Sequence, residues 1–212
     1  MGNEQSAAPL PGQAMPGEVI QNLRKGTPFT FVEADQILRR YSTLDATGTE
    51  GIAVEDCCFM QEFTACPFAG HVIRHHRDPE TKRILPRNFM KICAMLCRRT
   101  PALTKKQLLF DMFDVDKQKI LTHDAMFKIY KLLFSSAISD DHILALVFSA
   151  LRHPNLSHDD EVTRDEFAEM IPDNEIQERL SIDFAFDPSL SFVGQEEEEE
   201  EEEEGEDQPD NT

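Results

Sequence analysis

The stretch that decides the fold reads FDMFDVDKQKILTHDAMF and runs from Phe110 to Phe127. It consists of an apolar segment, a polar loop that begins at Asp114, and a second apolar segment. An aliphatic pair at residues 120–121 is the main interruption of the polar loop. The apolar segments have the composition of amphipathic helices, so the stretch predicts a helix, a short loop and a second helix.

Two aspartates two positions apart, Asp114 and Asp116, open this loop in the manner of a calcium-binding EF-hand loop. A working loop of this kind has twelve residues, with Gly at the sixth position and a bidentate Glu at the twelfth. Here Lys119 is the sixth residue and Ala125 is the twelfth. The stretch therefore predicts the skeleton of an EF-hand with much of the calcium chemistry removed.

The same plan occurs four times along the chain. The four loops would begin at Asp45, Arg77, Asp114 and Asn155. Their eighth residues are then all aliphatic: Ile52, Ile84, Leu121 and Val162. In paired EF-hand loops this position forms a small β-bridge, where an aliphatic side chain packs against its mate. We predict an all-α fold with two pairs of EF-hands, and short bridges between the loops of each pair.

Four regions follow from this pattern. We expect residues 1–29, rich in Pro and Gly, to be a flexible arm, and residues 30–98 to be the N-terminal EF-hand pair, here called the first unit. Residues 104–184 are expected to be the C-terminal EF-hand pair, here called the second unit. A capping box of Thr30 with Glu33 would open the first unit, and Thr104 with Gln107 would open the second. Residues 185–212 are predicted to be a disordered acidic tail.

The charge of the chain is uneven. The formal net charge is −19, and twelve acids with no base lie between Glu196 and the end, which leaves −7 for the rest. Nucleic acid is an unfavourable partner, because phosphate binding needs a basic surface. The sequence has no apolar run long enough to span a membrane, and its five cysteines form an odd number. We expect a cytoplasmic protein with reduced thiols.

The loops differ in what they offer to calcium, which needs six to eight oxygen ligands. The first loop ends in Asp56 where a bidentate Glu is needed, and the second begins with Arg77 and ends with Asn88. The fourth loop combines acidic residues with a closing Glu and is the calcium candidate, although weak. Its ligands would be Asn155, Ser157, Asp159, the Glu161 carbonyl, Thr163 and Glu166. For all four loops we favour a shape held by hydrogen bonds and the β-bridge.

Two further binding features follow from the sequence. Gly2 with Ser6 fits the pattern for N-myristoylation, which would place the protein peripherally at the inner face of the plasma membrane. An open EF-hand pair can accept an amphipathic helix in an apolar groove. The groove residues of the second unit are predicted to be Phe110, Phe113, Phe127, Tyr130, Leu133 and Phe134. His71 with His75, and Cys93 with Cys97, have zinc-compatible spacing but form no complete four-ligand set. No residue is assigned a catalytic role.

Several stretches resemble the calcineurin B family, and especially the calcineurin B homologous proteins. The resemblance covers about residues 2–184 and is distant. The segments that carry it are Met1–Ser6, Thr27–Thr30, Cys66–Ile73 and Gln177–Phe184. It implies a non-catalytic regulatory subunit that clasps a hydrophobic helix of a partner. The family keeps two good calcium loops in its C-terminal half, whereas this chain has Lys119, Ala125, Asn155 and Asp160 at key positions there.

The resemblance gives two partner classes, a sodium/proton exchanger for the homologous proteins and a phosphatase catalytic subunit for calcineurin B. We expect an adaptor that binds an amphipathic helix of a partner such as the exchanger, largely without calcium. One alternative is a calcium sensor or buffer that acts through the fourth loop. A second is a regulatory subunit of a calcineurin-type phosphatase.

Overall fold

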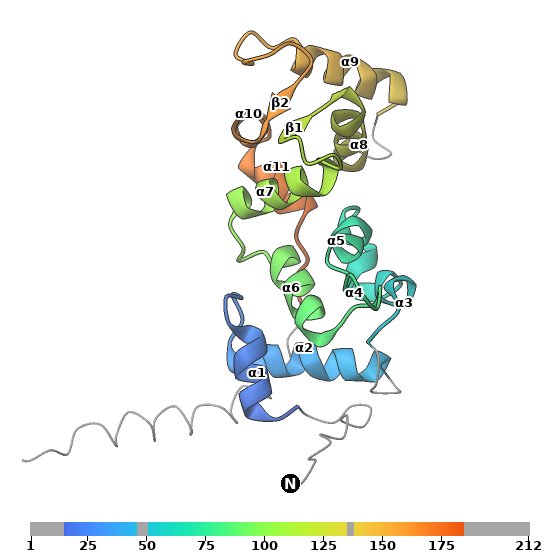
Figure 1. Ribbon diagram of the computed structural model, residues 1–212, viewed down its shortest axis with the longest axis vertical. Helices are drawn as coiled ribbons and strands as arrows, with labels where there is room; N and C mark the ends of the chain where they lie inside the picture. Colours follow the sequence, from blue (N-terminus) through green and yellow to red (C-terminus); the bar gives the residue numbers. More distant parts are fainter. Residues whose placement is uncertain (1–14, 46–50, 135–137, 185–212) are drawn as a thin grey trace, which may run out of the picture.

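The computed structural model describes residues 15–45, 51–134 and 138–184, which are mostly helical (Figure 1). The helices of its N-terminal half are α1 (Gly17–Arg24), α2 (Phe31–Leu44), α3 (Val54–Cys58), α4 (Gln61–Thr64), α5 (Ala69–His75) and α6 (Pro86–Leu96). The C-terminal half contains α7 (Ala102–Phe113), β1 (Ile120–Leu121), α8 (His123–Phe134), α9 (Asp140–Leu151), β2 (Val162–Thr163), α10 (Arg164–Met170) and α11 (Asp173–Arg179).

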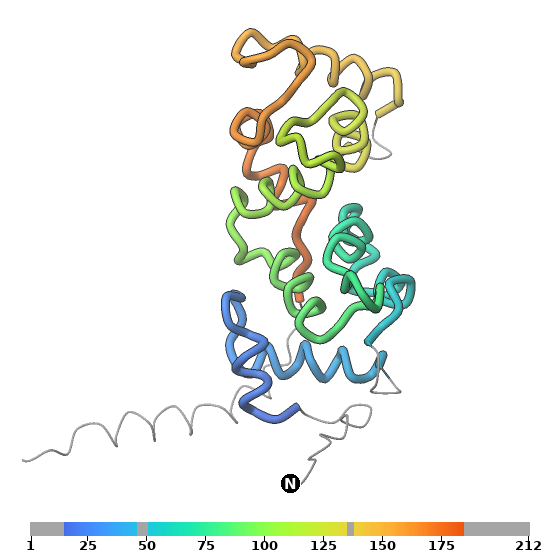
Figure 2. The backbone as a smooth tube through the Cα atoms, viewed as in Figure 1, coloured from blue at the N-terminus to red at the C-terminus, as the bar shows by residue number. Residues whose placement is uncertain are grey.

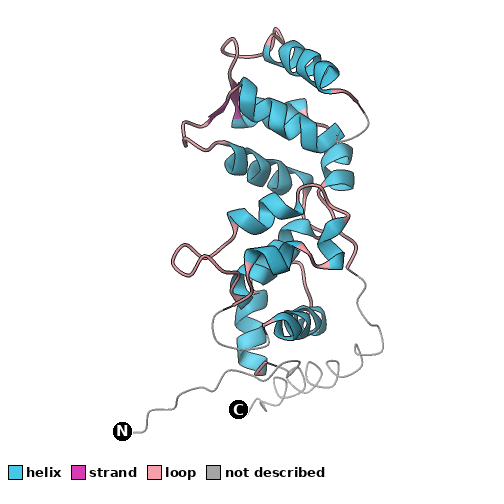
Figure 3. Cartoon of the chain, turned by 90° about the vertical axis from the view of Figure 1, so that its right-hand side faces the viewer, coloured by secondary structure: helices cyan, strands magenta, loops and turns pink. Residues whose placement is uncertain are grey.

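The helices are stacked along the long axis of the molecule. The helices α1 and α2 lie at one end and α9 with strand β2 at the other, as two perpendicular views show (Figures 1 and 3). Residues 180–184, after α11, run back along α6 (Figure 2). Ile182 fastens this segment, because its amide donates to the Leu96 carbonyl at 2.7 Å. The end of the second unit is therefore joined to the first.

Both predicted loop pairs are present. Ile52 and Ile84 form an antiparallel bridge in which their amides and carbonyls exchange hydrogen bonds of 3.0 and 2.8 Å. Strands β1 and β2 are antiparallel and align Leu121 with Val162. All four side chains are buried and belong to the hydrophobic core. The predicted all-α EF-hand fold with bridged loops is confirmed.

Some predicted boundaries differ from the structure. Part of the expected flexible arm forms helix α1, because Ile20 is buried against the core of the first unit. The capping box at Thr30 is present, but the one predicted at Thr104 is absent, because α7 already begins after Pro101. Gly2 and the acidic tail lie outside the described residues. The unit boundaries at residues 98 and 104 stay a prediction.

All five cysteines are free thiols. Cys93 and Cys97 are buried, and burial raises the pKa of Cys93 well above its ordinary value. Across residues 15–45, 51–134 and 138–184, no group of three or more His, Cys, Asp or Glu side chains converges in a way that could hold a metal ion. In the same part of the chain, no helix combines the length and the apolar character that crossing a membrane requires.

A buried lysine joins α7 to the C-terminal segment. Lys105 is fully buried, and its Nζ donates to Gln177 Oε1 at 3.1 Å and to Ser181 Oγ at 2.5 Å. Gln177 in turn donates its Nε2 to the Thr100 carbonyl at 2.8 Å. Neither partner of Lys105 is charged, so burial lowers the pKa of the amine to about 8.

This pKa makes a prediction for the pH dependence of stability. The folded Lys105 loses its proton near pH 8, whereas an unfolded lysine keeps it to about pH 10.4. Between these values the unfolded state binds more protons, so this group makes the protein more stable as pH rises. We expect Lys105→Met to remove that rise. The check is chemical denaturation of both proteins from pH 7 to 11. Parallel curves for the two would contradict the assignment, since every other titrating group is common to both.

Candidate functional site

The fourth loop, residues 155–166, is closed by its own hydrogen bonds. Glu166 Oε2 accepts from the Thr163 amide at 2.8 Å and from the Thr163 hydroxyl at 2.6 Å, while Oε1 accepts from the Ser157 amide at 2.6 Å. Thr163 and Glu166 form the capping box that starts α10. These hydrogen bonds, led by the one from the Thr163 side chain, lower the pKa of Glu166 to about 2.

In this arrangement the closing Glu is already engaged by donors of its own loop. A closing Glu binds calcium with both carboxylate oxygens, but here both oxygens of Glu166 are directed at donors of the loop. The six predicted ligands lie in one loop. Glu166 accepts hydrogen bonds from two of them, Ser157 and Thr163.

The other loops are held in a similar way. In the third loop, the Asp114 carboxylate accepts from the amides of Gln118 at 3.0 Å and Lys119 at 2.9 Å. In the second loop, the Asp78 carboxylate accepts from the amide and hydroxyl of Thr81. Part of the first loop, residues 46–50, lies outside the described residues. Donors within each loop therefore hold the carboxylates of Asp78, Asp114 and Glu166 in the described loops.

The sixth loop position keeps its special backbone although none of these residues is glycine. The φ angles are 59° at Lys82, 64° at Lys119 and 63° at Asp160. This left-handed conformation costs a residue with a Cβ roughly 1–2 kcal/mol. Because the same strain recurs at the same position of three loops, the bridge and the flanking helices must impose the loop shape.

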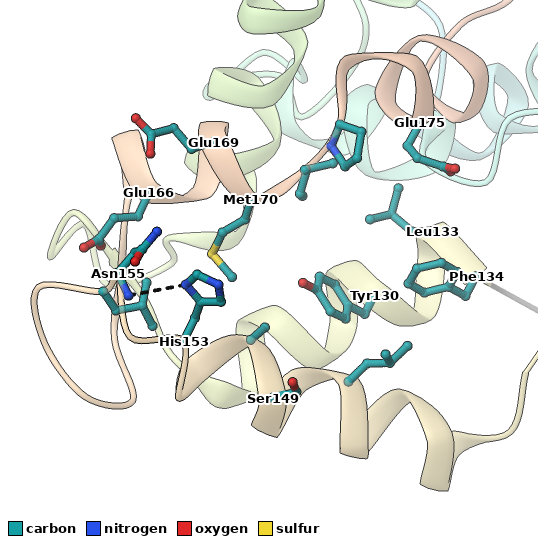
Figure 4. Close-up of a pocket in the computed structure, with 15 residues that line it drawn as sticks. Tyr130, Leu133, Phe134, Ser149, His153, Asn155, Glu166, Glu169, Met170 and Glu175 are labelled. Carbon is teal, nitrogen blue, oxygen red and sulfur yellow. Dashed lines mark hydrogen bonds between the residues drawn. The ribbon is translucent and has the colours of Figure 1, made fainter.

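An apolar pocket of about 550 Å³ lies in the second unit, between α8, α9 and the segment from α10 to α11 (Figure 4). Its apolar walls are formed by Tyr130, Leu133, Phe134, Leu146, Ala150, Leu156, Met170, Ile171 and Pro172. Its polar lining residues are Ser149, His153, Asn155, Glu166, Glu169 and Glu175. We call this pocket the second-unit groove. Such a volume lies within the range of protein sites that hold apolar ligand groups.

The predicted groove residues separate into two sets. Tyr130, Leu133 and Phe134 line the groove. The prediction is wrong for Phe110 and Phe113, which are buried in the core. Phe110 packs edge-on against Phe167, with ring centroids 5.9 Å apart. Their places on α7 direct both rings into the core, because α7 packs against α10 and α11.

Phe127 is also outside the groove. It is partly buried and its ring lies 5.9 Å from Lys131 Nζ, but it does not line the pocket. Residues 127, 130 and 134 follow helical spacing on α8, yet only the later two reach the space between α8 and α9. Spacing alone could not separate them, because residues three and four apart lie on one broad face.

Sequence reasoning missed the opposite wall of the groove. Met170, the last residue of α10, lines the pocket together with Ile171 and Pro172, which follow it. Met170 lies across the pocket from Tyr130 (Figure 4). Leu146 of α9 is 42% exposed, although the apolar spacing groups it with the buried residues Ile143 and Val147. One feature of the sequence could have indicated this wall: α9 carries apolar residues on more than one face. Three of them, Leu144, Leu146 and Phe148, are partly exposed in the structure.

The first unit has a smaller pocket of about 250 Å³. Its lining residues include Ile37, Phe63, Phe89 and Phe184. Phe184 comes from the C-terminal segment and packs edge-on against Phe29, with ring centroids 6.2 Å apart. The chain itself therefore contributes a wall to the pocket of its first unit.

Comparison with known proteins points to one family. The chain is similar to the type 1 calcineurin B protein of Dictyostelium discoideum, with 21% identity over 79% of this chain and 94% of that protein. It is 19% identical to calcineurin B of Naegleria gruberi and 18% identical to the type 2 calcineurin B protein of Rattus norvegicus. These matches cover 78% and 79% of this chain, and 93% and 96% of the relatives. All three relatives are named as subunits of calcineurin.

No protein-family profile matches the chain. The similarity is nevertheless spread over almost the whole length of each relative, and it agrees with the two bridged loop pairs described above. The special likeness to calcineurin B homologous proteins stays a prediction. The chain is thus distantly similar to calcineurin B subunits over most of its length.

Proposed function

We propose that the chain is a non-catalytic regulatory EF-hand subunit that holds an amphipathic helix of a partner protein in the second-unit groove, largely without calcium. The observation that carries the proposal is the combination of an open apolar groove with loops that are closed by their own hydrogen bonds. The family supports the regulatory role, because the similar proteins are named as subunits of calcineurin.

The shape of the groove suits a helix. Its walls come from α8, from α9 and from the α10–α11 segment, so an apolar helix face can contact three sides at once. Amphipathic helices bind such grooves with large side chains at positions i, i+3 or i+4, and i+7. Tyr130, Phe134 and Met170 supply aromatic and flexible apolar contacts, which dominate the binding energy of many interfaces.

The hydrogen bonds within the loops support binding that does not require a metal. In a calcium sensor, metal binding to the loops opens the helix pair and exposes the groove. Here the closing Glu166 is already held by Ser157 and Thr163, and the third loop ends in Ala125. A partner helix would therefore meet a groove that does not depend on loading of these loops.

Two partner classes are proposed for the helix. The resemblance to calcineurin B homologous proteins favours the juxtamembrane cytosolic helix of a sodium/proton exchanger. The names of the similar proteins favour the catalytic subunit of a calcineurin-type phosphatase. Titration with one peptide of each class distinguishes them, because each proposal expects its own peptide to bind the more tightly.

The chain offers a clean measurement and a matched control. It contains no Trp, so the fluorescence of a Trp placed on either peptide reports binding directly. We expect Leu146→Asp to weaken binding at least tenfold, because Leu146 lines the groove and is partly exposed. Leu144→Asp is the control, since Leu144 is similarly exposed on the same helix but does not line the groove. Equal binding by both variants, or no binding of either peptide at micromolar concentration, would exclude this site.

The calcium-sensor alternative is separated by the same titration in calcium and in a chelator. We expect peptide affinities within about twofold of each other. Calorimetry with calcium, and with Glu166→Gln as control, tests the fourth loop directly. Calcium heat that disappears in the variant, together with peptide binding only in calcium, would favour a sensor.

We also propose N-myristoylation at Gly2 as a membrane attachment, supported by the Gly2 and Ser6 pattern alone. A single myristoyl chain binds membranes only marginally, so the membrane-embedded partner would provide the second attachment. Mass spectrometry of the protein from a eukaryotic host should show one myristoyl group, and Gly2→Ala should lack it. An unmodified Gly2 would contradict the proposal.

A further inference from the structure

We propose that the helix bound in the second-unit groove is basic, with Lys or Arg side chains at both ends of its apolar face. This inference deepens the proposed function and rests on it. It concerns specificity: the apolar walls would provide contact area, and the acidic rim would select the partner.

The charged residues that line the groove are all acidic: Glu166, Glu169 and Glu175. Among the described lining residues there is no Lys or Arg, and His153 is the only ionisable base. Glu166 accepts hydrogen bonds from uncharged donors, which hold its carboxylate ionised without cancelling its charge. The edge of the groove, here called the rim, therefore carries three carboxylates, of which Glu166 is held against its own loop by hydrogen bonds.

Three cations of the same unit are paired with acids outside the groove. Lys131 of α8 pairs with Asp140 at 2.8 Å, and Lys106 of α7 pairs with Asp173 at 2.5 Å. Arg164 of α10 pairs with Asp111. Within the described residues, Glu166 and Glu169 have no ion-pair partner, and Glu175 has only a long contact of 3.9 Å with Arg179. The chain thus leaves most of this negative rim without a countercharge.

The pocket of the first unit gives an internal comparison. Its acidic lining residue, Glu62, pairs with Arg40, also a lining residue, at 2.8 Å. That rim is balanced by the chain itself. The two pockets therefore differ in charge. Of the two, the second-unit groove is the one whose acidic residues a basic partner would neutralise.

The acids lie at both ends of the groove (Figure 4). Glu166 and Glu169 are at the end that contains His153 and Asn155, and Glu175 is at the end that contains Leu133 and Phe134. A helix laid along the groove would meet a carboxylate near each of its ends. Basic residues toward both ends of the partner's apolar face would match this arrangement.

Other occupants are disfavoured by charge. The chain's own C-terminal run of nine Glu would be repelled by the rim. A second copy of the chain carries a net charge of −19 and would approach against the same repulsion. Complementary charge across an interface mainly provides specificity and faster association, which suits a groove whose affinity comes from apolar contact.

The test uses three synthetic helical peptides of about 18 residues with identical apolar faces and one Trp, long enough to present two turns or more to the groove. Their flanking positions carry Lys, Gln or Glu. With the full chain at low salt, we expect the Lys peptide to bind at least about fivefold more tightly than the Gln peptide, and the Glu peptide to bind least. In Glu169→Gln/Glu175→Gln, the ratio between the Lys and Gln peptides should fall below about twofold.

A charge-matched control separates the rim from the general acidity of the chain. Asp116→Asn/Asp124→Asn removes two exposed acids of the same unit that do not line the groove, and should keep the fivefold ratio. An equal loss in both double variants would overturn the inference. Equal binding of Lys and Gln peptides by the unmodified chain would also overturn it, and would leave the proposed function intact. Failure of every peptide to bind would overturn the proposed function itself.

Discussion

Replacement of Phe110 by Ala should lower the free energy of unfolding by about 3–5 kcal/mol. Phe110 is fully buried between α7 and α10, with Phe167 against its edge at a centroid distance of 5.9 Å. The Arg164 guanidinium lies 5.6 Å from the ring centroid. Removal of the ring loses apolar contact and leaves a cavity that neighbouring helices can fill only partly. Urea denaturation followed by far-ultraviolet circular dichroism measures the change.

Phe127→Ala is the matched control, since it removes the same ring from a partly buried position on α8. Its cost should be below about 2 kcal/mol, because less apolar area leaves the core. This pair of variants also tests the corrected assignment of Phe110. If Phe110 were a groove residue, its loss would leave stability nearly unchanged and weaken peptide binding instead.

Gly51→Ala should be the second severe change, with a cost of about 3 kcal/mol from backbone strain and lost hydrogen bonds together. Gly51 has a φ of 84°, and a Cβ placed there would lie 2.7 Å from the Ile84 carbonyl oxygen. That oxygen accepts hydrogen bonds from the Ile52 amide and the Tyr41 hydroxyl, each at 3.0 Å. The substitution adds a left-handed backbone penalty of roughly 1–2 kcal/mol and displaces two hydrogen bonds worth about 1 kcal/mol each.

Gly26→Ala separates the two causes. Gly26 has a similar φ of 76°, but a Cβ there would meet nothing within 4 Å. It should cost only the backbone penalty, roughly 1–2 kcal/mol. Thermal or urea unfolding of both variants gives the comparison. Equal losses of stability for Gly51→Ala and Gly26→Ala would mean that the Ile84 carbonyl can move aside at little cost. The bridge of the first unit would then contribute little to stability.

Much of the fold could be predicted because its signals are local. The helices follow apolar spacing, and the eighth loop residues identify the bridges, since each loop places that residue at a fixed distance from its flanking helices. The start of α2 was also readable, because Thr30 and Glu33 satisfy each other's backbone within one turn. The start of α7 was predicted wrongly. Thr104 and Gln107 have the spacing of a capping box, but the N-cap is Pro101, which makes no side-chain cap hydrogen bond.

Only part of the candidate site could be predicted from the sequence. Tyr130, Leu133 and Phe134 come from one helix, whose apolar spacing the sequence shows, whereas Ile171 and Pro172 come from a connection with no periodicity and Met170 is the last residue of α10. Phe110 and Tyr130 are both aromatic residues in apolar helical segments, so the sequence pattern does not distinguish them. Only the packing of α7 against α10 and α11 places one in the core and the other in a groove.

The sequence by itself determined the four helix–loop–helix motifs and the bridge residues. It also determined that calcium ligands such as the closing Glu of the third loop are missing. Each of these features depends on residues a few positions apart. Only the tertiary structure decided where the groove lies, that most of its acidic rim has no ion-pair partner among the described residues, and that Lys105 is buried among neutral partners. These properties arise where helices from distant parts of the chain meet, and side-chain burial and charge pairing are set by those neighbours.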